Sequence, residues 1–79
     1  MQLNHRLLEC FHSTMSVGTV TGAAEILNTS QPAVSRSLKQ LEDTVKMTLF
    51  TRSGNRVVPT QEAVLLYEEV DKSFRSVRH

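Results

Sequence analysis

The chain has 79 residues, of which 39% are hydrophobic and 22% are charged, and its formal net charge is +1. This length suits one small domain and leaves no room for an enzyme with a separate substrate domain. The apolar content is too high for a disordered chain, and no apolar run reaches the roughly 18 residues of a membrane-spanning helix.

Cysteine content and charge distribution say more than the totals. Cys10 is the single cysteine and has no partner for an internal disulfide, and polar residues follow Met1 where a secretory leader would be apolar. Both features indicate a protein of the reducing cytoplasm. Five basic and two acidic residues lie between Arg36 and Arg56, so this segment carries +3. A local positive patch suits contact with phosphate, although an ordinary solvated surface has the same composition.

The first predicted helix runs from Asn4 to about Val17, with Asn4 as its N-cap and Gly18 as its C-terminal stop. Its apolar stripe, which Leu7 and Cys10 flank, repeats at intervals of three and four residues: Leu8, Phe11 and Met15.

Three potential metal ligands, His5, Glu9 and His12, share another face of this helix. His5 and His12 are two turns apart, which is long for one ion, and no further cysteine or histidine stands nearby in the sequence. We interpret this face as polar surface, and we expect neither a metal nor another cofactor.

The residues from Val20 to Lys39 predict two short helices joined by a tight turn. The first runs from Val20 to Leu27 behind the cap Thr19, and Asn28 supplies a left-handed turn residue. Ala24 and Val34 stand ten residues apart, which is the spacing at which a helix-turn-helix packs its two helices closely. Ala23, Ile26 and Leu27 supply the other apolar positions.

The second helix of this pair runs from Gln31 to about Val45, with Ser30 as its cap and Pro32 in its first turn. At about 100° per residue, one arc of this helix is apolar and forms core: Val34, Leu38, Leu41 and Val45. A separate polar and basic arc is formed by Gln31, Pro32, Ser35, Arg36 and Lys39.

Side chains of this second arc match the chemistry of a DNA duplex. Gln and Arg make bidentate contacts with base edges, and Ser reaches a base or a phosphate. Glu42 and Asp43 follow on the same side, where their charge would repel phosphate and end the contact. The polar surface of any amphipathic helix is the competing interpretation, and the preceding turn favours DNA.

Residues Lys46 to Thr60 predict a small hairpin, or wing. Leu49 and Phe50 form the first strand, Val57 and Val58 form the second, and Pro59 closes it. The turn formers between the strands are Ser53, Gly54 and Asn55. Arg52 and Arg56 flank the tip, where arginine enters a minor groove or holds phosphate, unless the segment is a loop with two solvated arginines.

The last predicted helix runs from Gln61 to about Val77, with Thr60 as its cap. Its apolar seam has heptad-like spacing and comprises Ala63, Tyr67, Val70, Phe74 and Val77, with Leu66 beside it. We expect this seam to form a homodimer interface, because Phe74 and Val77 lie about four turns along the helix, beyond the reach of so small a domain. The alternative is that the seam packs back on the first three helices, as we expect of its near end at Ala63.

Together these residues resemble the N-terminal DNA-binding domain of the LysR-type transcriptional regulators. The resemblance is carried by Phe11, Gly18–Thr21, Ala23–Glu25, Ser30–Arg36, Leu38, Leu41–Glu42, Leu49–Arg52, Arg56 and Thr60. It implies a mainly α winged helix-turn-helix over residues 1–60 and a linker and dimerisation helix over residues 61–79. The family's effector-binding domain is absent from the sequence, so we expect no inducer pocket. The stretch from Asn55 to Ala63 is similar to regulators of opine and amino-acid catabolism.

The resemblance implies a cytoplasmic transcription factor that is not an enzyme and binds interrupted inverted repeats in double-stranded promoter DNA as a homodimer. The expected DNA-binding residues are Ser30, Gln31, Pro32, Ser35, Arg36, Lys39, Arg52 and Arg56. The alternative is a winged helix used only for protein assembly, with the last helix as its working surface. A small hydrolase or metalloenzyme has no supporting arrangement of side chains.

Overall fold

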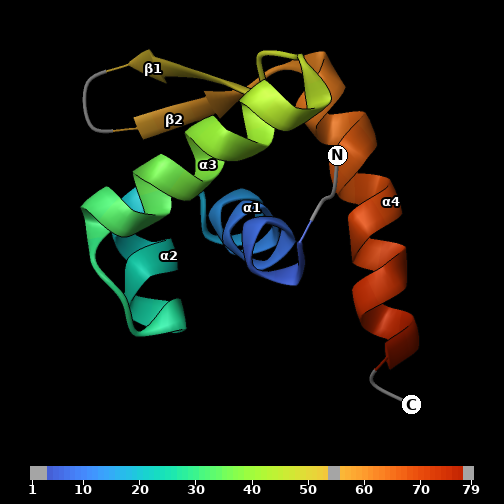
Figure 1. The fold of residues 1–79 in the computed structure, drawn as a ribbon, viewed down its shortest axis with the longest axis horizontal. Coiled ribbons are helices and arrows are strands. Elements are labelled where there is room, and N and C mark those ends of the chain that lie inside the picture. Colours follow the sequence, from blue (N-terminus) through green and yellow to red (C-terminus); the bar gives the residue numbers. More distant parts are fainter. Residues whose placement is uncertain (1–3, 54–55, 78–79) are drawn as a thin grey trace.

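A computed structural model describes residues 4–53 and 56–77 of the chain. Its elements in chain order are α1 (His5–Val17), α2 (Val20–Leu27), α3 (Gln31–Val45), β1 (Phe50–Ser53), β2 (Arg56–Pro59) and α4 (Gln61–Val77) (Figure 1). The two strands pair in antiparallel fashion and form a two-stranded sheet. The predicted mainly α fold with one hairpin, a winged helix-turn-helix followed by a long helix, is confirmed. The predicted turn residues Gly54 and Asn55 lie outside the described residues.

Each helix begins at a side chain that binds its free N–H groups. The side-chain oxygens of four caps accept backbone N–H groups at 2.9 to 3.2 Å: Asn4 from Leu7, Thr19 from Gly22, Ser30 from Ala33, and Thr60 from Ala63. These bonds satisfy donors that have no partner within the helix. All four caps were predicted from the sequence.

The first three helices end at residues with left-handed backbone. Gly18, Asn28 and Lys46 have φ values of 91°, 56° and 58°. Gly18 and Asn28 were predicted to end their helices. Lys46 was not, because lysine gives no local signal for a conformation that side chains with a Cβ rarely adopt.

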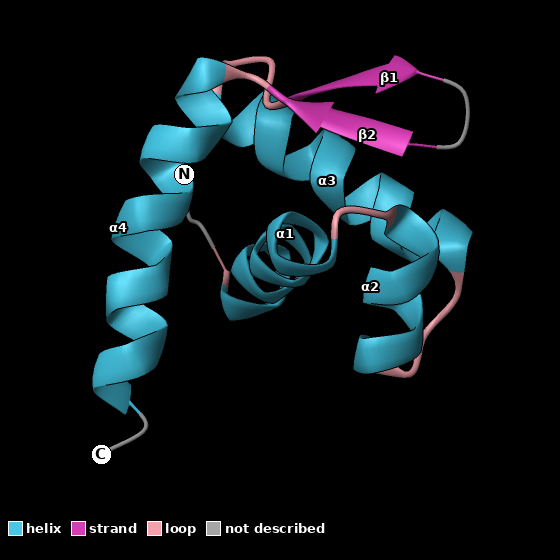
Figure 2. Cartoon of the chain, turned by 180° about the vertical axis from the view of Figure 1, so that it is seen from behind, coloured by secondary structure: helices cyan, strands magenta, loops and turns pink. Residues whose placement is uncertain are grey.

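Helix α1 lies at the centre of the fold, with α2 and α4 on opposite sides of it and α3 crossing it (Figures 1 and 2). The largest fully buried side chains come from α1, α3 and the segment before β1: Phe11, Leu41, Leu49, Val34 and Thr14. On α1 the buried face comprises Leu7, Cys10, Phe11 and Thr14. The buried face of α1 is therefore rotated slightly from the predicted stripe. Leu8 and Met15 are only half-buried, and Thr14 is buried because its hydroxyl donates to the Cys10 carbonyl at 2.7 Å.

The hairpin is attached to α3 by a carboxylate. Glu42 Oε2 accepts the backbone N–H of Leu49 at 2.7 Å and that of Phe50 at 3.1 Å. Leu49 is fully buried just before β1, and the Phe50 ring packs near Phe11 with centroids 5.9 Å apart. Glu42, which the sequence suggested only as a repulsive charge near DNA, therefore holds the wing in place.

Helix α4 packs on the rest of the chain along much of its length. This corrects the expectation that its far end, at Phe74, lies beyond the reach of the domain. Ala63 is fully buried and Val70 is 7% exposed within the single chain. Phe74, which we expected to lie beyond the domain, meets the rings of His5 and His12 on α1 with centroids 5.4 and 4.7 Å away. Leu66 and Tyr67 are half-buried against the same core. The side chain of Val77 lies outside the described part.

Large apolar side chains are exposed at positions that the sequence analysis did not expect to be exposed. On α4 they are Val64 and Leu65, which are 43% and 58% exposed, whereas Ala63 and Val70 of the predicted seam are buried. Ile26, which we expected to contribute to the packing of α2, is 63% exposed. Which apolar side chains of α2 and α4 are exposed depends on the neighbouring elements that cover each helix, because two adjacent positions on a helix point in different directions.

We expect Glu42→Ala to lower the free energy of unfolding by about 2 kcal/mol, because it leaves two partly buried N–H groups without an acceptor. Asp43→Ala is the matched control, since Asp43 is exposed and pairs only at 3.7 Å with the exposed Lys39. Urea denaturation of both variants measures the difference. Equal stability of Glu42→Ala and the unaltered chain would contradict this role.

Candidate nucleic-acid interface

The predicted polar arc is an exposed face at the N-terminal end of α3. Ser30, Gln31, Pro32, Arg36 and Lys39 are exposed, and Ser35 is half-buried. The opposite face of the same helix buries Val34, Leu38 and Leu41. Because that apolar face is fixed in the core, the polar face points outward with a defined orientation.

Charges on this face are available to a ligand. In the described part of the chain no ion pair engages Arg36. Lys39 pairs with Asp43 one turn later at 3.7 Å, with both side chains about 70% exposed. Such a pair contributes little and is readily exchanged for a phosphate. Ser30 differs from its neighbours because its hydroxyl already caps the helix.

The two wing arginines face different directions. Arg52 stands opposite the buried Val57 in the hairpin register, whereas Arg56 stands opposite Ser53. Successive side chains of a strand alternate between faces, so Arg52 shares the face that covers α3 and Arg56 lies on the other face. Both side chains are exposed.

Arg52 also contacts the polar face of α3 directly. Its Nη2 donates to Ser35 Oγ at 3.3 Å. A groove between α3 and the hairpin includes Ser35, Lys39 and Arg52 in its lining. The structure thus brings Arg52 into one surface with the predicted α3 residues and leaves Arg56 at the far side of the wing. We call this surface the α3 face, and it comprises Ser30, Gln31, Pro32, Ser35, Arg36, Lys39 and Arg52.

Sequence reasoning missed the residues that position this surface. Glu42 sets the start of β1, and the Thr60 hydroxyl donates to the Thr48 carbonyl at 2.7 Å while capping α4. Only the Thr60 cap had a sequence signal. A carboxylate seven residues before a buried leucine is too common a pattern to indicate a backbone contact.

Residues 4–53 and 56–77 were compared with two other kinds of site, a metal site and a membrane-spanning helix. No group of three or more His, Cys, Asp or Glu side chains gathers there in a way that could hold a metal ion. None of the helices described is long and apolar enough to cross a bilayer. His5 and His12, interpreted from the sequence as polar surface, differ in fact, since His5 is exposed and His12 is half-buried beneath α4.

Comparison with protein families and solved structures agrees with this geometry. A family model described as "Bacterial regulatory helix-turn-helix protein, lysR family" matches residues 5–64. The octopine catabolism/uptake operon regulatory protein OccR of Rhizobium meliloti is 46% identical over 77 residues, which are 98% of this chain and 26% of OccR. This similarity also agrees with the predicted resemblance to regulators of opine catabolism.

Two solved structures have the same fold. The probable transcriptional regulator PA0477 from Pseudomonas aeruginosa is 35% identical with a TM-score of 0.89, over 95% of this chain and 25% of that one. The BenM DBD/benA site 1 DNA complex is 28% identical with a TM-score of 0.88, over 96% of this chain and 85% of that one. This chain spans about a quarter of the length of the curated relatives that it matches. It belongs to the lysR family of bacterial regulatory helix-turn-helix proteins.

Proposed function

We propose that this chain is the sequence-specific DNA-binding part of a cytoplasmic transcriptional regulator that acts as a homodimer on promoter DNA. The observation that carries the proposal is the α3 face, an outward, basic surface whose orientation the core fixes. OccR is named as an operon regulatory protein, and the BenM domain is titled as a DNA complex. Both names support a function by binding and not by catalysis.

On this proposal α3 lies in the major groove with its N-terminal half against the bases. Arg36 is suited to the O6 and N7 acceptors of guanine, and Gln31 to the N6 and N7 atoms of adenine. Ser35 and Lys39 reach phosphates, and the exposed ring of Pro32 offers apolar contact. Ser30 contributes by capping the helix, whose N-terminal N–H groups favour a nearby phosphate.

The wing supplies two different contacts. Arg52, held beside Ser35, binds the backbone that borders the same groove. Arg56, on the other face of the hairpin, is directed to the adjacent minor groove or its phosphates. The sequence analysis assigned both kinds of contact to both arginines, and this proposal assigns one kind to each.

The dimer on this proposal forms through the outer face of α4. Val64 and Leu65 are exposed apolar side chains of this helix, whereas Ala63 and Val70 of the predicted seam are buried within the chain. A pair of inverted half-sites in DNA requires two recognition helices related by a two-fold axis, which a helix-to-helix contact supplies. We further propose that residues 1–60 form the DNA-reading part, that residues 61–79 form the linker, and that this chain itself binds no inducer.

We expect Arg36→Ala to weaken binding by about 1–3 kcal/mol and to relax sequence preference, because one bidentate base contact is lost. The duplex is selected with the unaltered protein from a randomised pool, and binding is measured by fluorescence anisotropy. Lys46→Ala, which removes an exposed cation at the far end of α3, is the control. If the two variants bind equally well, Arg36 does not read a base. If neither the variants nor the unaltered protein selects any sequence, the alternative of a winged helix used only for protein assembly replaces the DNA-binding function.

We expect Leu65→Asp to weaken self-association at least about tenfold, because the dimer would have to bury an unpaired carboxylate. Val58→Asp is the matched control, since Val58 is 47% exposed but lies on the hairpin. Sedimentation equilibrium measures both. An unchanged association constant for Leu65→Asp would place the interface on another surface.

A further inference from the structure

The contact between α1 and α4 is built around one histidine. The His12 ring lies 5.1 Å from the Tyr67 ring at an interplanar angle of 25°, and 4.7 Å from the Phe74 ring at 36°. Its Nε2 is 2.8 Å from Asp71 Oδ1. A single half-buried side chain of α1 therefore meets three residues of α4, which lie on one face at intervals of four and three.

The carboxylate of Asp71 joins this histidine to an arginine. Its Oδ2 atom is 3.0 Å from Arg75 Nε, one turn further along α4. An ionised carboxylate only accepts hydrogen bonds, so the proton in the His12 contact is on Nε2. The Asp71 side chain is 26% exposed, so the contact is partly shielded from water and salt.

Helix α4 is held at its start, at the buried Val70 near its middle and at the contact with His12. At the start of the helix, Thr60 caps it and Ala63 is fully buried. Asp71 is eight residues beyond Ala63, or about 12 Å along a helix. Contacts separated by that distance together fix the direction of a helix, and the His12–Asp71 contact adds a directional bond to the apolar packing of Val70.

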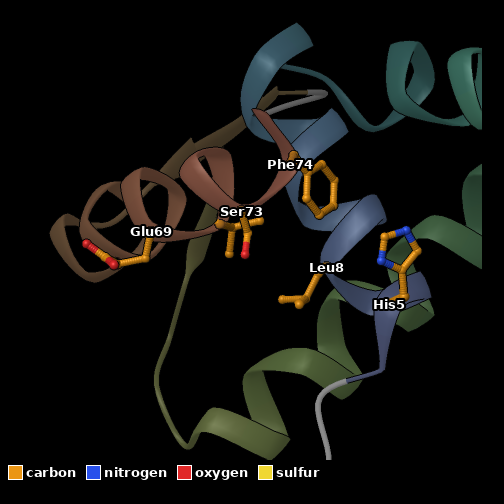
Figure 3. A pocket seen from close by; sticks show the side chains of 6 residues that line it. His5, Leu8, Glu69, Ser73 and Phe74 are labelled. Carbon is orange, nitrogen blue, oxygen red and sulfur yellow. The ribbon is translucent and has the colours of Figure 1, made fainter. Parts of the chain in front are cut away.

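Part of the boundary between α1 and α4 is open, and this gives the polar contact its importance. An open groove runs between α1 and α4, lined by His5, Leu8, Glu69, Val70, Ser73 and Phe74 (Figure 3). Leu8 and Phe74 come from the two facing helices and border the space. Apolar packing at Val70 thus leaves part of this boundary open, and the His12–Asp71 bond adds directional contact to it.

We propose that His12 and Asp71 are positioning residues that set the direction of α4 relative to the α3 face. Helix α1 packs against both α3 and α4, so it transmits the orientation. In a dimer joined through α4, that direction determines the distance between the two recognition helices and hence the preferred spacing of two half-sites. This consequence rests on the proposed dimeric DNA-binding function, whereas the contact itself does not.

Two measurements test the proposal with the variants Asp71→Ala and His12→Ala. Glu69→Ala is the matched control, because Glu69 is an exposed carboxylate of the same helix that pairs with Lys72. Hydrogen exchange of the α4 amides should become about tenfold faster in both variants and stay unchanged in the control. His12→Gln should recover part of the protection, because its amide can still donate to Asp71.

The second measurement uses duplexes that carry two copies of the selected half-site at spacings varied by one base pair. The unaltered protein should prefer one spacing, and Asp71→Ala should bind several spacings within about threefold while binding a single half-site as before. Faster exchange with an unaltered spacing preference would overturn the positioning role. If hydrogen exchange of the α4 amides is unchanged in the variants, the His12–Asp71 contact does not constrain α4. Failure of the unaltered protein to bind any duplex would overturn the proposed function and, with it, the consequence for spacing, while the exchange result still decides the contact.

Discussion

Burial of one face of α3 is the constraint on which the rest of the structure depends. Val34, Leu38 and Leu41 are packed in the core, and the helical period then leaves no choice about where the other face points. That face carries Gln31 and Arg36. The orientation of the candidate DNA-reading surface is therefore a by-product of the hydrophobic core, and it exists before any ligand arrives. A preformed surface of this kind loses little conformational entropy on binding.

The hairpin segment and α4 contribute Leu49, Val57, Ala63 and Val70 to the core, and a few directional bonds add to this attachment. The Glu42 carboxylate fixes the hairpin to α3, and the Thr60 hydroxyl links the hairpin's end to the start of α4. The His12–Asp71 contact then fixes α4 further along its length. These bonds relate the wing and α4 to the α3 face, so that the molecule presents a single geometry and not three loosely joined parts.

The sequence predicted the helices, their caps and the polar arc of α3 because local rules decide them: period, capping side chains and turn residues. It did not predict what covers the seam of α4. The heptad-like seam was recognised, but a second chain was expected to cover it. That expectation rested only on the length of the helix, whose far end was judged to lie beyond a domain of this size. Phe74 meets the two histidines of α1, and no local pattern marks such a contact between residues far apart in the sequence.

The most direct test of the account is a titration of the unaltered protein against its selected inverted repeat and a scrambled duplex of equal length, at several salt concentrations. The account predicts tighter binding to the repeat at every concentration, with both affinities falling steeply as salt rises, because phosphate contact releases counterions. Equal affinity for the two duplexes, or affinity that does not respond to salt, would contradict sequence reading by the α3 face.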